Sequence, residues 1–262
     1  MNGVNGQTHT LGVLMAVHGR HALAELALCA ALASSPPGWE IRPVVVMSLD
    51  DAPAVAPFCD AAGIPWVAAD NDPLSFKWQR GLEFLRGVLP GAEAVTILGS
   101  DDFCSPAWWQ YVCRMIHSGE EQGFGTHKVW MLDSDTLQSG IFVCQSTTSM
   151  GAGRTFPRHH LERADWVLWD APINKGLDNH CGSRLARLDL PIRTVRGAPG
   201  IIIDVKTSEN IHSWQEFATW CGLPLSKFEI VLDPKGSRDL LEQHELFTHM
   251  EPLFAKHMAE AS

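Results

Sequence analysis

The sequence predicts an α/β fold in which helices cover both faces of a mostly parallel β-sheet, with a further helix at the C-terminus. Short apolar runs alternate with Ala/Leu-rich or amphipathic stretches through the first 120 residues, and this alternation is typical of a parallel sheet. Gly, Pro, Ser and Asp separate the runs, as expected of turns. The 262 residues suffice for one domain with a substantial core, whereas two full domains would be tight.

Four buried strands are expected in the first half of the chain, because each apolar run is short and stops at a polar turn. These strands cover Leu11–Val17, Ile41–Leu49, Trp66–Ala68 and Ala94–Leu98. Helices are expected after each strand, on the basis of Ala/Leu content, amphipathic spacing or a proline in the first turn. These helices cover His21–Ala33, Ala54–Ala62, Ser75–Val88 and Pro106–His117.

The second half of the chain is less regular. Two apolar runs, Lys128–Leu132 and Gly140–Cys144, predict strands that could form a hairpin. Residues 146–176 are rich in Gly, Pro, Arg and Trp, which indicates a long functional loop with a short helix. The remaining expected elements are a helix at Leu177–Leu188, a strand at Gly200–Val205, a short helix or turn at Ile211–Trp220 and a helix at Arg238–Ala259. We therefore expect one domain over residues 1–235, and over residues 236–262 a helix that packs on it or makes a homodimer.

Composition restricts the class of protein. Charged residues make up 19% of the chain and its net charge is −10, so a disordered chain and a nonspecific nucleic-acid binder are both disfavoured. No apolar run is long enough to cross a membrane, and the first ten residues do not resemble a secretory signal. Seven cysteines without a C-x-x-C pair indicate a reducing, cytoplasmic location.

Charge is unevenly distributed along the sequence. Residues 151–200 carry eight Arg or Lys and five acidic residues, a net charge of +3, whereas the rest of the chain carries −13. A local basic segment in an acidic chain suits an anionic small molecule better than a nucleic-acid duplex. A solvated face of scattered arginines explains the same pattern equally well.

Three of the four predicted strands end in polar or acidic residues, at the edge where parallel sheets bind ligands. The residues are His18 and Arg20 after the first strand, Asp50 and Asp51 after the second, and Asp101 and Asp102 after the fourth. Adjacent carboxylates repel each other unless a cation or hydrogen-bond donors neutralise them. Hard divalent cations take such oxygen ligands and often bridge to phosphates. An Asp that caps the helix at Pro106 is the alternative interpretation.

The order of these motifs resembles that of glycosyltransferases with the GT-A fold, a Rossmann-like fold, and most of all the family 2 type with its phage and bacterial relatives. The motifs are VHGR, SLDD, PLSFKWQRGL and ILGSDD, and the resemblance covers roughly residues 10–215. It implies transfer of a sugar from a nucleotide-diphosphate sugar to a hydroxyl acceptor, with Mn²⁺ or Mg²⁺ as cofactor. Inversion at the sugar is expected and retention stays open. The acceptor could be a glycan, a small molecule, a protein or a modified nucleobase.

The resemblance also implies roles for individual residues. The donor-binding residues would be His18, Arg20, Asp50, Asp51, Lys77, Asp101 and Lys206, and the metal ligands Asp101, Asp102 and His212. The chain departs from the family pattern at two positions. Gly99 stands where the L-D-x-D-D motif has its first Asp, and Ala52 follows Asp51 where an Asp-Gly-Ser element is usual. For Lys77, a solvated helix face is the alternative.

On the acceptor side, the resemblance points to Asp178 as the catalytic base that takes the proton of the hydroxyl. An acidic residue at a helix start is also an ordinary partner of the helix dipole. Arg154, Arg158 and Trp169 would lie toward the acceptor. Trp169 would suit the apolar face of a sugar ring, although a core position is common for Trp.

Two other functions remain possible on the same fold. A nucleotidyltransferase that makes nucleotide sugars would share the metal, but it usually carries a Gly-rich loop with Arg and Lys after the first strand, and AVHGRHALAE is poor in these residues. A non-catalytic binding or structural protein is the second alternative. A zinc-protease motif is excluded, because His244 and His249 are five residues apart and would diverge around a helix.

Overall fold

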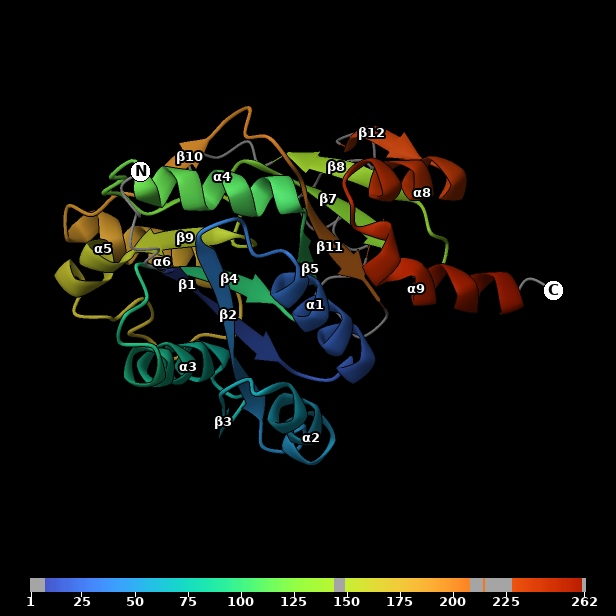
Figure 1. The fold of residues 1–262 in the computed structure, drawn as a ribbon. Coiled ribbons are helices and arrows are strands. Elements are labelled where there is room, and N and C mark those ends of the chain that lie inside the picture. Colours follow the sequence, from blue (N-terminus) through green and yellow to red (C-terminus); the bar gives the residue numbers. More distant parts are fainter. Residues whose placement is uncertain (1–7, 144–148, 208–213, 215–227, 261–262) are drawn as a thin grey trace, which may run out of the picture.

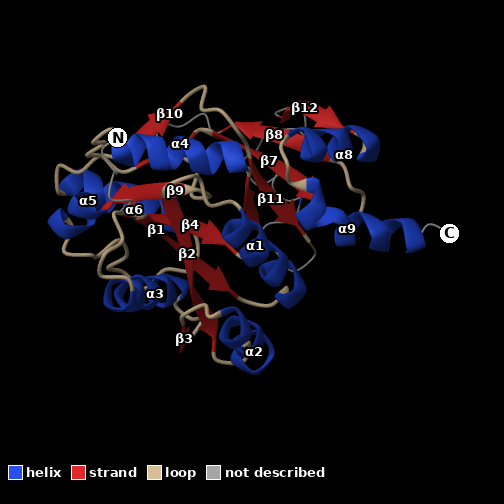
Figure 2. Ribbon diagram, viewed as in Figure 1, coloured by secondary structure: helices blue, strands red, loops and turns tan. Residues whose placement is uncertain are grey.

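The structure, a computed structural model, describes residues 8–143, 149–207, 214 and 228–260. It is an α/β protein with two β-sheets, and helices lie around both of them (Figures 1 and 2). The larger sheet has the order β10 (Arg193–Val195), β6 (Phe124–Thr126), β9 (Arg154–Pro157), β4 (Ala94–Gly99), β1 (His9–Val17), β2 (Trp39–Ser48) and β3 (Trp66–Ala69). The smaller sheet has the order β12 (Phe228–Leu232), β8 (Ser139–Val143), β7 (Lys128–Asp133), β11 (Ile202–Lys206) and β5 (Asp102–Cys104).

The four strands predicted in the first half are confirmed, and they pair in parallel in the order β3, β2, β1, β4. The middle of β1 is buried on both faces, which explains its continuous apolar run. Met15 belongs to the core formed with α1 (His21–Ala33), whereas Leu14 belongs to the core formed with α3 (Leu74–Val88). Helices therefore cover both faces of this sheet, as predicted.

The prediction of a mostly parallel sheet is wrong, because the larger sheet is mixed. Strand β9 lies antiparallel between β4 and β6. The hydroxyls of Thr96 and Thr155 lie 2.8 Å apart across the pair of β4 and β9 and are buried. The stretch predicted to be a long loop thus contains a central strand, and it continues directly into α5 (Arg158–Arg163).

The smaller sheet begins close to the carboxyl end of β4, because its strand β5 follows β4 in the chain after a turn of two residues. The predicted hairpin is confirmed as β7 and β8, which pair antiparallel. Strand β11 pairs in parallel with β7 and antiparallel with β5, and this register places Asp204 opposite Asp102. Strand β5 begins three residues after β4 ends. The pairing of β11 with β5 therefore brings Asp204, a residue from late in the chain, to the end of β4.

The C-terminal region forms two helices, α8 (Pro234–Gln243) and α9 (Phe247–Glu260), where the sequence predicted one. Glu245 between them adopts a positive φ of 59°. The N–H of Leu246 donates to the carbonyl of Leu241 at 2.8 Å, and Leu246 is fully buried. Burial of Leu246 thus favours an interruption of the helix at a place where the sequence has neither Gly nor Pro. Helix α9 contacts α1 and extends away from the sheets (Figure 1).

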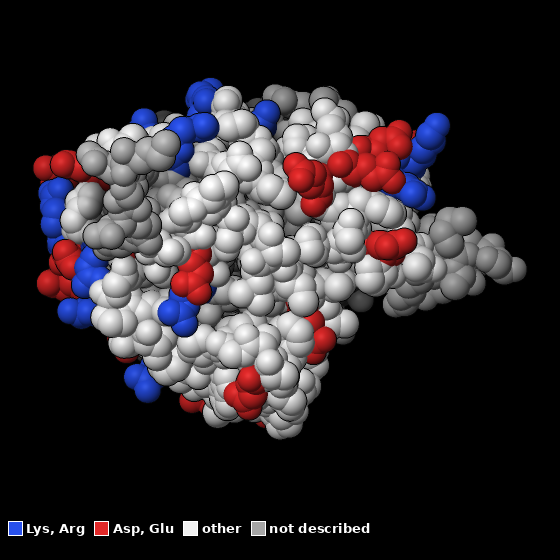
Figure 3. All heavy atoms as spheres, viewed as in Figure 1, with Lys and Arg blue, Asp and Glu red and all other residues white. Residues whose placement is uncertain are grey.

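The other helices in the described residues are α2 (Ala52–Ala62), α4 (Pro106–His117) and α6 (Leu177–Arg187), all close to their predicted positions. None of the helices in the described part of the chain combines the length and apolar character that a membrane crossing requires. On the face shown in Figure 3, the charged side chains lie mainly toward the rim, and much of the middle is uncharged.

Candidate metal and nucleotide site

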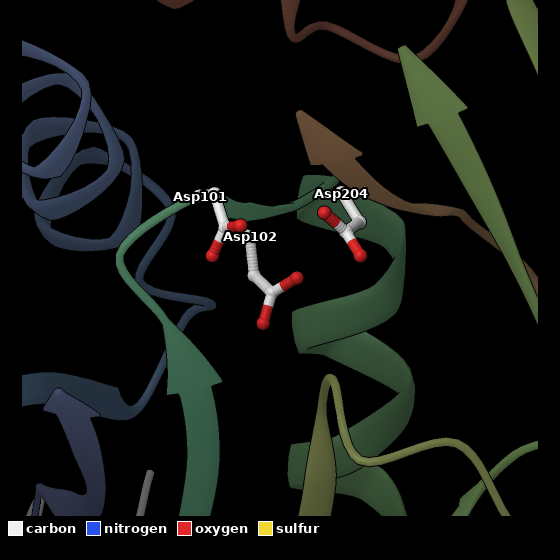
Figure 4. Close-up of side chains that lie close together, drawn as sticks. All are labelled: Asp101, Asp102 and Asp204. Carbon is white, nitrogen blue, oxygen red and sulfur yellow. The ribbon is translucent and has the colours of Figure 1, made fainter. Parts of the chain in front are cut away.

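Three carboxylates meet where β4 ends. Asp101 lies in the turn after β4, Asp102 begins β5, and Asp204 lies in the middle of β11 (Figure 4). One carboxylate oxygen from each residue lies within 4.8 Å of the others, and Asp102 is only 6% exposed. Two of the three were predicted, and the pairing of β11 with β5 adds the third.

Gly99 makes room for this cluster. A Cβ atom at this position would lie 2.5 Å from Oδ1 of Asp101 and 3.1 Å from Oδ2 of Asp102. The N–H of Gly99 donates to Oδ2 of Asp102 at 2.6 Å. The glycine that departs from the L-D-x-D-D pattern therefore lets the two following carboxylates fold back against the strand end.

Two cations flank the carboxylates. Nη1 of Arg20 lies 2.5 Å from Oδ2 of Asp101, and Nζ of Lys206 lies 2.6 Å from Oδ2 of Asp204. Arg20 has a left-handed backbone (φ 48°) at the start of α1, and this turn aims its side chain along the ends of the strands. Counted over the described residues and with every group ionised, three carboxylates and two cations leave one negative charge in excess.

Burial makes that excess costly. Desolvation raises the pKa of Asp102 well above its usual value, and the charges of Asp204 and Asp101 add to the effect. Desolvation also raises the pKa of Asp204, although Lys206 opposes this. Burial disfavours charge on Lys206, but the neighbouring carboxylates outweigh it and raise the pKa of its ammonium. Among the described residues, the three carboxylates outnumber the two basic side chains beside them, so a further cation would reduce the repulsion between them.

The raised pKa values predict how stability depends on pH in the absence of divalent ions. In the unfolded chain an Asp ionises near pH 4. A group with a raised pKa in the folded state therefore loses its contribution to stability as the pH rises above 4. We expect Asp102→Asn to gain stability over the wild type as the pH rises from 5 to 8. Urea unfolding in EDTA measures this, and a gap that does not depend on pH would contradict the assignment.

At the end of β2, Asp51 is held by two histidines. Its Oδ1 accepts from the N–H of Gly19 at 3.1 Å and contacts Nε2 of His21 at 2.8 Å. Nδ1 of His18 lies 3.4 Å from Oδ2 of Asp51 and 3.0 Å from the hydroxyl of Ser48. Burial opposes ionisation, yet hydrogen bonds from His21 and Gly19 hold the pKa of Asp51 below its usual value. The ring of His18 itself is 63% exposed at this edge.

Lys77 is 1% exposed, so the solvated helix face considered for it is excluded. Its ammonium donates to the carbonyl of Val17, to the hydroxyl of Ser48 at 2.8 Å and to Oδ1 of Asn71 at 3.0 Å. Burial lowers its pKa to about 8, although Asp51 opposes the shift. Because its three acceptors follow or end β1, β2 and β3, Lys77 ties the carboxyl ends of three strands together.

Replacement of this lysine is expected to destabilise the protein. In Lys77→Met three acceptors lose their donor, two of them on the buried residues Val17 and Ser48, so the free energy of unfolding should fall by roughly 3 kcal/mol. Arg80→Met on the same helix is the matched control, because the Arg80 side chain is 59% exposed. Urea denaturation of both variants measures the effect, and equal stability of the two would show that the Lys77 contacts contribute nothing.

Asp178 lies at the same edge of the sheet. It stands in the first turn of α6 and packs directly over Gly151, where any side chain would collide with its carboxylate. The N–H of Gly153 donates to the carbonyl of Ile97 at 2.9 Å, which places this turn beside the carboxyl end of β4. Asp178 is 55% exposed, and Nη1 of the buried Arg154 lies 4.0 Å from its Oδ1. The predicted base is thus exposed to solvent, over a turn that packs beside the last residues of β4.

Two residues predicted for the acceptor side lie elsewhere. The N–H of Arg158 donates to the carbonyl of Glu93, the residue before β4, and its Nε donates to Glu162 at 2.7 Å. Arg158 therefore lies at the amino end of β4, away from the cluster. Trp169 is 5% exposed, with its ring 5.8 Å from that of Trp78, so it belongs to the core between α3 and α6.

Sequence reasoning did not single out Asp204 or His21. The signal for Asp204 was an acid inside the apolar run Ile-Ile-Ile-Asp-Val, where a charge is unexpected without a partner. Asp50, predicted to contact the donor, is exposed in the turn two residues after β2. His212, predicted as a metal ligand, lies outside the described residues.

No model of a known protein family matches this chain, and no curated protein matches it. The likeness to GT-A glycosyltransferases therefore rests on the motifs alone. Any function proposed for the protein must be argued from the chemistry of its carboxylate cluster and the surrounding edge.

Proposed function

We propose that this protein is a metal-dependent glycosyltransferase with a GT-A-like fold, which moves a sugar from a nucleotide-diphosphate sugar to a hydroxyl acceptor. The observation that carries the proposal is the meeting of Asp101, Asp102 and Asp204 with Arg20 and Lys206 at one strand edge. Carboxylate oxygens suit a hard divalent cation, and the two basic side chains suit a diphosphate.

The residues present fit Mn²⁺ or Mg²⁺. Oδ1 of Asp204 is buried and has no hydrogen-bond partner in the described part of the chain. Together with the raised pKa of Asp102, this orphaned oxygen supports a site that gains from a bound cation. His212 stays a predicted further ligand, and a nitrogen ligand would favour Mn²⁺. When bound, the ion would offset negative charge on the departing diphosphate.

The two cations would change partners when the donor binds. Arg20 and Lys206 neutralise Asp101 and Asp204 in this structure. In a donor complex, Asp101 and Asp204 would hold the cation, and the N–H groups of Arg20 and Lys206 would donate to the oxygens of the diphosphate. The planar guanidinium of Arg20 can contact two of them at once. On the other side, Asp50 and the exposed ring of His18 would contact the nucleoside, with Asp51 holding the turn that carries His18.

Asp178 would act as the base. Its carboxylate takes the proton of the acceptor hydroxyl, the hydroxyl oxygen forms a bond to the anomeric carbon, and the bond from that carbon to the phosphate oxygen breaks. The nucleoside diphosphate leaves with the electron pair, and the sugar is inverted in one displacement. Arg154, which also donates to the carbonyl of Asp178 at 3.2 Å, fixes the position of the base.

Product analysis tests the proposal against its alternatives. The full chain is incubated with Mn²⁺ and with uridine-, guanosine-, thymidine- and adenosine-diphosphate sugars, and released nucleotides are measured by ³¹P NMR. Release of nucleoside diphosphate, lost in Asp102→Asn, supports a glycosyltransferase. Pyrophosphate formed from a sugar phosphate and a nucleoside triphosphate would identify a nucleotidyltransferase. Absence of both turnover and donor binding would favour a non-catalytic protein.

A further inference from the structure

The N-terminus of α3 is capped by a loop from much later in the chain. A proline precedes α3 and offers no side-chain acceptor for the first N–H groups of the helix. The N–H of Leu74 donates instead to Oδ1 of Asn174 at 2.6 Å, and the N–H of Ser75 donates to the carbonyl of Ile173 at 3.0 Å. Residues 171–174, the capping loop, thus satisfy N–H groups that the residue before the helix cannot.

Side chains from both sides strengthen this contact. The hydroxyl of Ser75, which is fully buried, donates to the carbonyl of Ala171 at 2.7 Å and accepts from the N–H of Ile173 at 3.0 Å. The amide of Asn174 donates to Oδ1 of Asp72 at 2.8 Å. Within the described part of the chain, five hydrogen bonds therefore join the capping loop to the start of α3 and the turn before it.

The capping loop leads directly into α6, whose first turn carries Asp178. Asp170, the residue before the loop, returns to the same helix. Its Oδ1 lies 2.8 Å from Nε2 of His180, and its Oδ2 accepts from Nε of Arg184 at 3.0 Å. Both ends of the loop are therefore attached to α6, so a shift of the loop along α3 would carry the first turn of α6 with it.

We propose that the capping loop is a positioning element, which sets where Asp178 lies relative to the carboxyl ends of the strands. Lys77, near the start of α3, donates to the last residues of β1 and β2, so α3 connects the loop to the donor side of this edge. Buried apolar side chains hold the middle of α6, whereas polar contacts such as these hold the end that carries Asp178. The inference rests on the function proposed above, because Ser75 and Asn174 act through Asp178 as the base.

An exchange of hydrogen-bonding partners tests the role in transfer. Asn174→Ala removes two of the hydrogen bonds from an exposed position, so the fold should survive. In the double variant Asp72→Asn with Asn174→Asp, the amide and the carboxylate change places and both hydrogen bonds can form again. With the nucleotide-diphosphate sugar identified by product analysis, Asn174→Ala should lower kcat by on the order of tenfold to a hundredfold at unchanged KM, and the double variant should restore it. Gln110→Ala, an exposed amide on α4, is the matched control.

Hydrogen exchange measured by mass spectrometry tests the loop on the full chain in EDTA, without donor. The amides that begin the hydrogen bonding of α6, such as the N–H of His180, should exchange about tenfold faster in Asn174→Ala and at the wild-type rate in the double variant. Unchanged exchange in Asn174→Ala, or faster exchange with an unchanged kcat, would overturn the proposal. The expected exchange in a chain that transfers no sugar would support the positioning of Asp178 by the loop and overturn only the transferase.

Discussion

Asp102→Asn and Asp204→Asn are each expected to weaken Mn²⁺ binding by at least the roughly 10–100-fold that the loss of an outer-shell partner costs. Each removes a charged oxygen ligand and leaves a neutral amide of the same shape, so the local packing survives. The Asp102 variant should also unfold about 2–4 °C higher without metal, which corresponds to about 1 kcal/mol in a chain of this size. Calorimetric titration with Mn²⁺ and thermal unfolding in EDTA measure the two effects.

Asp239→Asn provides the matched control for these titrations. Asp239 is an exposed carboxylate on α8 and takes no part in the cluster. Its replacement removes the same charge from the chain, so it separates a ligand effect from a general electrostatic one. Equal Mn²⁺ affinity in the wild type and in both cluster variants would show that the ion binds elsewhere.

Asp178→Asn is expected to lower the rate of sugar transfer by about 10²–10⁴, the usual contribution of a general base, while donor affinity stays unchanged. The amide keeps the contact with Gly151 and loses the ability to take a proton, so the loss should appear in turnover and not in binding. Single-turnover kinetics with a saturating donor, together with calorimetry of donor binding, measure the two quantities separately.

The control for the base lies at the other end of the same helix. Asp189 follows α6 with a positive φ of 56°, which Asn adopts as readily as Asp. Asp189→Asn should transfer sugar at the wild-type rate. If Asp178→Asn also does so, Asp178 only favours the start of the helix, and Asp170, which contacts His180 and Arg184, is the next candidate.

The parallel half of the fold could be predicted because its signals are local. Strands β1 and β2 each contain a run of apolar residues, and acids follow β2 and β4 at the edge where a parallel sheet is expected to bind ligands. The same reasoning paired Asp101 with Asp102, since both follow one strand. The spacing of apolar residues and the polar turn residues between the runs thus located this edge and the helices that cover both faces of the sheet.

The rest of the site depends on pairings that no local pattern specifies. Strand β9 is only four residues long and sits in a Gly- and Arg-rich stretch, so it looked like a loop. Asp204 reaches the cluster only because β11 pairs antiparallel with β5, a strand of three residues. Short strands of this kind are stabilised by their neighbours, and their partners are invisible in the sequence.

Side-chain direction was the other unpredictable quantity. Helical spacing placed Lys77 on a face with Arg80, yet one side chain is buried and the other is exposed. The difference arises because carbonyl and hydroxyl acceptors at the ends of the strands compensate the buried ammonium. Tertiary contacts of this kind determine whether the ammonium group of a lysine contacts solvent, a ligand or other protein groups.

A crystal grown with Mn²⁺ and uridine diphosphate tests the central claim most directly, through the anomalous scattering of manganese. We predict a peak within coordinating distance of carboxylate oxygens from at least two residues of the cluster, with the diphosphate within reach of Arg20 and Lys206. A diphosphate bound without a manganese peak at Asp101, Asp102 or Asp204 would contradict it.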